Sequence, residues 1–195
     1  MNFDQWRHYL RGLAFEAFKK PGRAIEEYRL ALRHNPGFAQ AALCLGYLHA
    51  ARSEYDEAED YFLIGLRLKP NADVYFNLGF IRDKAGRKEQ AVEAFREAVR
   101  LKPALDRAWY GMGLALGALG RHQEAAKALE EAGRLQPMNG HAWYALGMAY
   151  HHARQPEKVK EVALHMVRFD PAMTRQLIKE AERGDLAHLV QDLQL

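Results

Sequence analysis

The sequence has only one cysteine, Cys44, among its 195 residues. A single cysteine cannot form a disulfide within the chain or a cysteine-based zinc site. Cys44 lies in an apolar run, where a buried and unreactive thiol is expected. The chain must therefore be held together by packing, and a reducing compartment is compatible with it.

Long apolar runs are also missing. The longest weakly polar stretch, from Gly111 to Gly120, is far shorter than the ~20 residues that a helix needs to cross a bilayer. The first residues show neither the basic segment nor the apolar segment of a secretory signal. We therefore expect a cytoplasmic protein without membrane insertion.

Blocks of like charge are absent too. The 28 Lys and Arg residues are scattered among 25 Asp and Glu residues, and the net charge is only +3. A surface that follows a nucleic-acid backbone needs clustered positive charge, so we expect no nucleic-acid partner. Apolar residues make up 49% of the chain, which is typical of a folded protein and too high for a disordered one.

Catalytic motifs are not recognisable. No nucleophile stands beside a His and an Asp in a known arrangement, and no glycine-rich loop follows a predicted strand. The histidines His141 and His152 are eleven residues apart on one predicted helix, about 16 Å, which is too far to share a metal. We expect no enzyme activity, no cofactor and no metal.

What the chain does contain is an internal repeat of glycine and proline. Five glycines are each followed 24 residues later by a proline, and successive glycines are 34, 33, 34 and 34 residues apart. A fixed period of this length is the mark of a repeat protein. The pairs are Gly12 and Pro36, Gly46 and Pro70, Gly79 and Pro103, Gly113 and Pro137, and Gly147 and Pro171.

Other columns recur with the glycine. In the first four repeats a small residue comes 12 positions later, a bulky one follows after four more, and a second small one after three more. Spacings of three and four describe one helix face, polar turns between the two halves of a repeat predict a helix reversal, and proline ends the second helix. The members are Ala24, Tyr28 and Ala31; Ala58, Phe62 and Gly65; Ala91, Phe95 and Ala98; and Ala125, Leu129 and Ala132.

Each repeat is thus predicted to be a helical hairpin, and its columns resemble the tetratricopeptide repeat (TPR), best between Trp143 and Tyr150. The resemblance covers roughly residues 3 to 171. It implies an all-α fold, an α-α superhelix or TPR solenoid of five helical hairpins plus C-terminal capping helices. We expect one domain over 1–195, with repeats at about 5–38, 39–71, 72–105, 106–139 and 140–173 and a cap at 174–195.

The end of the array departs from the pattern. The fifth repeat carries Val159, Ala163 and Met166 at its second-helix columns, which predicts different packing against whatever follows. An amphipathic segment at 172–183 then resembles a capping helix, which repeat arrays need to cover their last apolar face. After a break at Gly184, Asp185 is predicted to cap a final helix at 186–193.

The resemblance also implies where a ligand binds, because first helices of TPR hairpins line a concave groove. Two columns of these helices are wholly apolar or aromatic. The column three residues before each glycine is equally consistent with structural support, whereas the column one residue after it is often polar in the family and predicts an exposed apolar binding surface. The first column is Tyr9, Leu43, Phe76, Tyr110 and Tyr144, and the second is Leu13, Tyr47, Phe80, Leu114 and Met148.

Polar residues are predicted at the two edges of the groove, where they would set register and specificity; they include Arg107 and His141 on one edge and His151 and His152 on the other. In the fourth repeat the second edge carries Gly117 and Ala118 instead, which leaves room for a bulky side chain of a partner.

One charged specialisation of the family is not present. TPR proteins that bind acidic C-termini of chaperones use Lys, Asn, Asn, Lys and Arg over three repeats. The matching positions here are Leu43, Tyr47, Asn77, Arg107 and Gly111, of which only Asn77 and, loosely, Arg107 fit. We therefore expect an apolar or amphipathic ligand, such as a helix.

The sequence thus predicts a protein–protein interaction scaffold, adaptor or assembly chaperone that binds an apolar or amphipathic segment of a protein or peptide partner. Two alternatives remain open at this point. One is a self-associating module that forms a homo-oligomer through the groove or the tail, and the other is the targeting arm of a larger enzyme.

Overall fold

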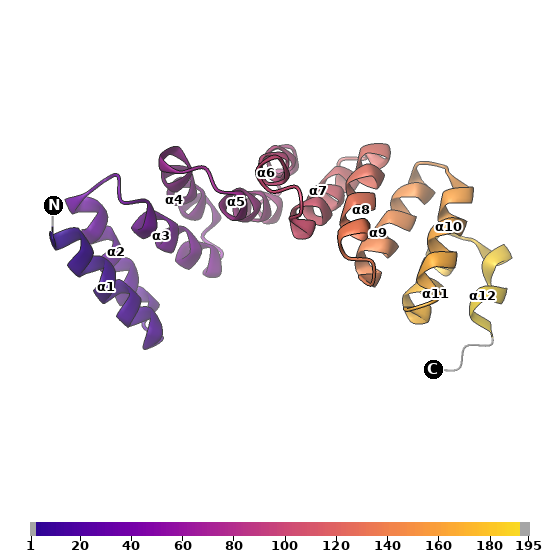
Figure 1. The fold of residues 1–195 in the computed structure, drawn as a ribbon, viewed down its shortest axis with the longest axis horizontal. Helices are drawn as coiled ribbons and strands as arrows, with labels where there is room; N and C mark the ends of the chain where they lie inside the picture. The colour runs from indigo at the N-terminus through magenta and orange to yellow at the C-terminus, as the bar shows by residue number, and fades with distance from the viewer. Residues whose placement is uncertain (1–2, 192–195) are drawn as a thin grey trace. The chain divides into compact units, whose positions relative to one another are not determined.

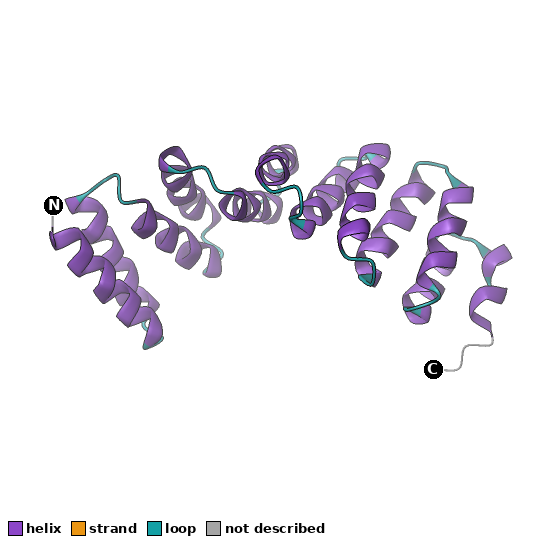
Figure 2. Ribbon diagram, in the orientation of Figure 1, coloured by secondary structure: helices purple, strands orange, loops and turns teal. Residues whose placement is uncertain are grey.

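The computed structural model describes residues 3–191, and every regular element in that range is a helix (Figures 1 and 2). The all-α prediction is confirmed. In chain order the helices are α1 (Phe3–Ala17), α2 (Pro21–His34), α3 (Ala39–Ala51), α4 (Tyr55–Leu68), α5 (Ala72–Lys84), α6 (Lys88–Leu101), α7 (Asp106–Ala118), α8 (His122–Leu135), α9 (Gly140–His152), α10 (Pro156–Met166), α11 (Pro171–Glu180), the 3₁₀ turn η1 (Gly184–Leu186) and α12 (His188–Gln191).

The helices follow the predicted hairpins. Consecutive helices pack in pairs, α1 on α2, α3 on α4, α7 on α8 and α9 on α10. The chain divides into two compact units, Met1–Arg87 and Lys88–Leu195, so the boundary falls between the two helices of the third repeat. The single domain over 1–195 stays a prediction.

A left-handed residue ends the first helix of every repeat and reverses the chain. The backbone N–H that follows it bonds back to the last turn of the helix, for example from Glu54 to the carbonyl of His49, which satisfies carbonyls that would otherwise lack a partner. The left-handed residues are Lys19, Ser53, Gly86, Gly120 and Arg154, with φ of 54°, 60°, 79°, 74° and 55°. In the first repeat the turn ends at Lys20, because Pro21 already begins α2.

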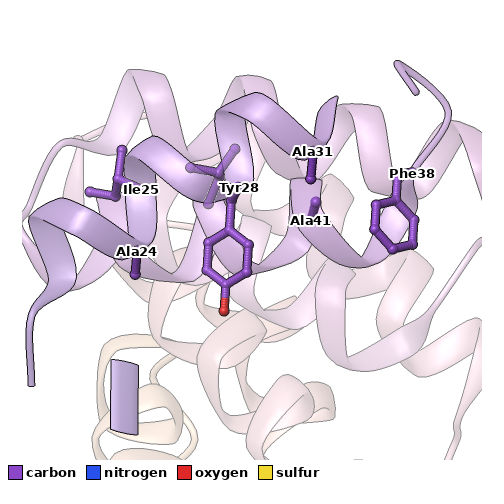
Figure 3. Packing of buried hydrophobic residues seen from close by; sticks show 7 residues of the cluster. Ala24, Ile25, Tyr28, Ala31, Phe38 and Ala41 are labelled. Carbon is purple, nitrogen blue, oxygen red and sulfur yellow. The ribbon is translucent and has the colours of Figure 1, made fainter. Parts of the chain in front are cut away.

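In the first unit the repeat glycines are sites of close helix contact. A methyl group added at Gly46 would lie 2.6 Å from the ring of Phe62, and one at Gly12 would meet the ring of Tyr28. Both rings are fully buried. Figure 3 shows Tyr28 projecting from α2 into the cluster that also contains Ala24, Ala31 and Ala41. The repeated spacing between the glycine and the bulky residue therefore has a steric cause.

In the second unit the same contact changes partner in the last repeat. Gly113 packs on Leu129 of α8, but Gly147 packs on Leu177 of α11. Val159, Ala163 and Met166 are buried, yet none of them supplies the contact to Gly147. The predicted difference in packing is confirmed, and its cause is that the cap provides the bulky side chain.

The cap begins as predicted and ends differently. α11 begins one residue before the predicted amphipathic segment and ends three residues before its end, and Asp170 caps the helix by accepting a 2.9 Å hydrogen bond from the N–H of Met173. The predicted N-cap role of Asp185 is wrong: this residue lies inside η1, and its carboxylate accepts hydrogen bonds from Arg183 at 2.8 and 2.7 Å. The last described helix begins at His188, and the predicted end of that helix at Leu193 lies outside the described residues.

The repeat prolines have a second role in the second unit. The indole N–H of Trp109 donates to the carbonyl of Pro103 at 2.9 Å, and that of Trp143 donates to Pro137 at 3.0 Å. These bonds tie a first helix to the proline that ends the preceding repeat.

None of the described helices is both long enough and apolar enough to cross a membrane.

Candidate functional site

The first predicted column has a largely structural role in the first unit. Tyr9 is half-buried among aromatic rings, with its centroid 5.2 Å from that of Phe38 and 5.7 Å from that of Tyr28. Leu43 packs on the bare backbone of Gly65, and Phe76 is half-buried. These side chains support the hairpins, so structural support accounts for their apolar character.

The second column is more accessible in this unit. Leu13, Tyr47 and Phe80 are 39%, 44% and 47% exposed. The Tyr47 ring packs edge-on against Phe62 at 5.1 Å, and its hydroxyl accepts a 3.3 Å hydrogen bond from the amide of Asn77. Asn77 is therefore held by a neighbouring hairpin residue. This set presents apolar surface, and its role in binding stays a prediction.

In the second unit the same columns line a cavity. Leu114 is 45% exposed, Tyr110, Tyr144 and Met148 are half-buried, and Arg107 is exposed on α7. Three of these predicted residues, Leu114, Tyr144 and Met148, border a hollow of about 360 Å³ formed by α7, α8 and α9. The structure thus brings together predicted site residues of the fourth and fifth repeats; Tyr110 and Arg107 are not among the residues that line the hollow.

Several of the residues that line this cavity are small or apolar. Its walls include the backbone of Gly117 and the side chains of Leu129 and Ala145. A Cβ added at Gly117 would meet nothing within 4 Å, which agrees with the expectation that this position leaves room for a bulky group. We call this hollow the α7–α9 cavity.

Histidines form one end of the α7–α9 cavity. His122 and His152 both border it, with ring centroids 4.9 Å apart, and His151 lies 5.2 Å from His152. Burial lowers the pKa of His152 below its usual value, and the neighbouring His122 and His151 lower it further. His152 is therefore neutral at pH 7, since its ordinary pKa is about 6.5.

A polar hollow adjoins the histidines at the hairpin turns. It shares His122 and His152 with the cavity and adds Arg121, Glu124 and Arg154. Arg121 donates to Glu124 at 2.7 and 2.6 Å, which neutralises this pair and lowers the pKa of Glu124. Two arginines and one glutamate border this hollow, so the local balance is positive.

The cap orients one wall of the cavity. The hydroxyl of Tyr144 donates to the carboxylate of Glu180 on α11. Burial, together with this hydrogen bond, raises the pKa of Tyr144 to about 12. The phenol therefore stays protonated at physiological pH and keeps its hydrogen bond. The polar end of Tyr144 points at the cap, and its ring remains as cavity wall.

Sequence reasoning missed part of this site. Leu129 and His122 both lie on a second helix, α8, whereas the repeat pattern places only first helices along the groove and therefore points to neither. Within the part of the chain that is described, no cluster of three or more His, Cys, Asp or Glu side chains is arranged to hold a metal ion.

Comparison with known proteins finds the same repeat in other chains. Family models described as "Tetratricopeptide repeat" match residues 9–73 and 110–158, and a second such model matches 72–105. A "Peroxisomal targeting signal receptor" of Candida glabrata is 36% identical over 74 residues, which are 37% of this chain and 12% of the receptor. The chain thus matches only about an eighth of the length of that relative.

Two solved structures share the fold. The MamA protein superimposes with a TM-score of 0.79 at 19% identity, covering 100% of this chain and 99% of that one. YrrB, described as "a TPR protein with an unusual peptide-binding site", also gives 0.79, at 23% identity over 90% of each chain. At these identities the likeness establishes the solenoid fold and nothing further.

Proposed function

Because the chain belongs to the tetratricopeptide-repeat family, we propose that it is a scaffold that binds a peptide segment of a partner protein along the first helices of its hairpins. The observation that carries this proposal is the α7–α9 cavity, an apolar hollow of about 360 Å³ bordered by the exposed Leu114. The peptide-binding site named for YrrB and the targeting-signal role named for the peroxisomal receptors support it.

The cavity suits one bulky apolar side chain of the partner. Its volume lies at the lower end of the range for ligand pockets, and Met148 can adapt its flexible side chain to the shape of an occupant. Binding energy at protein interfaces concentrates where such an anchor enters a desolvated pocket. A leucine or phenylalanine of the partner is therefore the proposed anchor.

The positive end of the cavity selects what lies beside that anchor. His122, His152 and Arg154 border the adjoining hollow, and opposite charges across an interface favour the matching partner. A carboxylate next to the apolar anchor would find Arg154 and two imidazoles within reach. We propose that the partner segment carries an acidic residue adjacent to its leucine or phenylalanine.

Filling the cavity tests the proposed function. Gly117→Leu should weaken binding at least tenfold, because the new side chain occupies the space of the anchor. It should not unfold the chain, since a Cβ at this helix position meets nothing within 4 Å and leucine favours helix over glycine. The measurement is fluorescence anisotropy with labelled peptides that carry one Leu or Phe beside one Glu.

Gly22→Leu is the matched control for this test. Gly22 is also a helix residue with open space around it, but it lies on α2, in the other unit. This variant should bind the same peptides as tightly as the wild type. Wild-type affinity in the Gly117→Leu protein would show that the cavity does not hold the anchor.

The pH dependence of binding tests the acidic neighbour. The pKa of His152 is lowered in the free protein, so its charge appears only below about pH 6.5, and bound carboxylate would draw a proton onto it. Affinity for the Glu-containing peptide should therefore rise several-fold between pH 7.5 and 5.5. Arg121, Glu124, Arg154, His122 and His151 also face His152 or its hollow.

Two variants separate the contribution of His152 to peptide binding from that of Arg154. His152→Gln should flatten the pH profile and leave affinity at pH 7.5 nearly unchanged, because the imidazole is neutral there. Arg154→Gln should lower affinity at every pH. If a peptide with Gln in place of Glu shows the same rise on acidification, then the histidines are not recognising a carboxylate.

A further inference from the structure

The turn that joins α1 to α2 exposes an aromatic ring beside three cations. Phe18 follows the last residue of α1 and is 73% exposed. Lys19 and Lys20 come directly after it, Arg23 lies in the first turn of α2, and all three are exposed. We call Phe18, Lys19, Lys20 and Arg23 the basic tip.

Hydrogen bonds order the backbone of the basic tip. The N–H of Lys19 donates to the carbonyl of Glu16 at 2.8 Å, and that of Lys20 donates to the carbonyl of Phe15 at 2.8 Å. The guanidinium carbon of Arg23 lies 5.7 Å from the ring centroid of Phe15, within the range of a cation–π contact. Because the tip is ordered in advance, binding to a surface would require little further ordering of the chain.

The other hairpin turns do not combine these features. Among the residues that the structure describes, none at the positions equivalent to Phe18 is a large exposed apolar side chain; they are Arg52, Ala85, Leu119 and Ala153. In three of these turns an arginine is paired with a carboxylate: Arg52 with Glu54 at 3.0 Å, Arg87 with Asp56 at 2.9 Å, and Arg121 with Glu124 at 2.6 Å.

The first hairpin has an excess of positive charge as large as that of the whole chain. Residues 3–38 include seven Lys and Arg and four Asp and Glu, and the net charge of the full sequence is also +3. Two of the four carboxylates are paired within the hairpin, Asp4 with Arg7 at 3.2 Å and Glu27 with Arg11 at 3.0 Å. The other two, Glu16 and Glu26, are outnumbered by five exposed cations, Lys19, Lys20, Arg23, Arg29 and Arg33.

We propose that the basic tip binds the surface of an anionic lipid bilayer, with Phe18 inserted at the level of the headgroups and the cations beside it on the lipid charges. Peripheral binding combines an apolar side chain that enters the boundary between headgroups and acyl chains with basic residues that attract anionic lipids. The basic tip supplies both within six consecutive residues, 18–23.

A nucleic acid is the alternative polyanion, because an exposed aromatic ring can also stack on a base. Its phosphates form a line and are best matched by a continuous track of cations. On α2 such a track is interrupted, since the exposed Glu26 lies three residues from both Arg23 and Arg29. The charge of a bilayer is spread over a plane, so a cluster of cations at one end of a hairpin is sufficient.

The expected binding is weak and reversible. Each Lys or Arg near an anionic membrane strengthens binding about fivefold, and partial burial of a phenylalanine side chain adds about tenfold. The three cations and Phe18 together give an association constant on the order of 10³ M⁻¹. That value is below the ~10⁴ M⁻¹ of a single myristoyl chain, so the basic tip would hold the chain at a membrane only transiently.

Cosedimentation of the whole chain with lipid vesicles at low salt tests the proposal. Vesicles of phosphatidylcholine with about 30% phosphatidylserine, at up to about 5 mM lipid, should bind most of the wild type, whereas vesicles of phosphatidylcholine alone should bind little. Lys19→Gln/Lys20→Gln should bind the anionic vesicles about 25-fold more weakly, and Phe18→Ser about tenfold more weakly.

Lys69→Gln/Lys102→Gln is the matched control. It removes the same two charges from exposed lysines that directly follow α4 and α6, so it should bind the anionic vesicles within about twofold of the wild type. Equal thermal unfolding of the four proteins verifies their folding.

Each other outcome overturns the proposal. A wild type that does not sediment with the anionic vesicles, or that sediments equally with the neutral ones, would show that the tip does not recognise anionic lipid. An equal loss in the control variant would show that only the net charge matters, and unchanged binding by Phe18→Ser would exclude insertion of the ring. Tighter binding to a single-stranded oligonucleotide or to polyglutamate than to the vesicles would assign the tip to a different polyanion.

Discussion

Gly46→Ala is expected to lower the free energy of unfolding of the first unit by about 2 kcal/mol, although alanine is the better helix former. The added methyl group would lie 2.6 Å from two ring atoms of Phe62, and this ring is fully buried and cannot move aside freely. Overpacking of this kind costs about 3 kcal/mol, and the helix preference of alanine offsets about 1 kcal/mol of it. Urea denaturation followed by the fluorescence of Trp6 measures the effect in this unit.

Two further substitutions test whether steric overlap causes the expected loss of stability in Gly46→Ala. Gly117→Ala should raise the stability of the second unit by up to about 1 kcal/mol, because the helix gains and nothing lies within 4 Å. Phe62→Leu should cost less in the Gly46→Ala background than in the wild type, since the smaller side chain relieves the overlap. Strictly additive effects of the two substitutions would contradict the proposed contact.

The hairpins could be predicted from the sequence because their causes are local and repeated. The glycine and the proline recur in all five periods and the bulky residue 16 positions after the glycine recurs in the first four, and the structure places Gly46 against Phe62 and Gly113 against Leu129. The turns were found for the same reason, although Ser53 adopts the left-handed conformation at φ 60° without being a glycine.

The parts that were missed depend on contacts between elements that do not repeat. Asp185 has the residue type and position of an N-cap, but Arg183 engages its carboxylate and the local chain forms a 3₁₀ turn instead. Leu177 follows the last repeat, so no column of the pattern could assign it to Gly147. The periodicity of the sequence contains no information about contacts that occur only once in the structure.

Part of the candidate site could also be predicted from the sequence. Leu114, Tyr144 and Met148 belong to columns that the repeat defines, and they do line the α7–α9 cavity. His122 enters the cavity from a second helix and is positioned by the stacking of α8 against α9. Its contact with His152 arises only in the tertiary structure, since 30 residues separate the two histidines in the sequence.

Truncation of Leu177, which lies in the cap, is the second change that we expect to have a large effect on stability. Leu177→Ala should destabilise the second unit by about 3 kcal/mol, since Leu177 is fully buried and both of its methyl groups face Gly147. Truncation of a buried leucine costs about 2–5 kcal/mol, depending on how far the cavity collapses. Here the glycine backbone cannot fill the space, so we expect a value near the middle of that range. Trp109 and Trp143 report unfolding of this unit by fluorescence.

Leu164→Ala is the control for the cap. Leu164 lies on α10 and is 40% exposed, so its truncation should cost less than 1 kcal/mol. If Leu177→Ala costs no more than this control, the cap does not supply the contact that closes the last repeat. Leu177→Ala should also weaken peptide binding, because a displaced α11 would release the Tyr144 hydroxyl from Glu180 and with it one wall of the α7–α9 cavity. The cap would then stabilise the array and shape its binding site through the same helix.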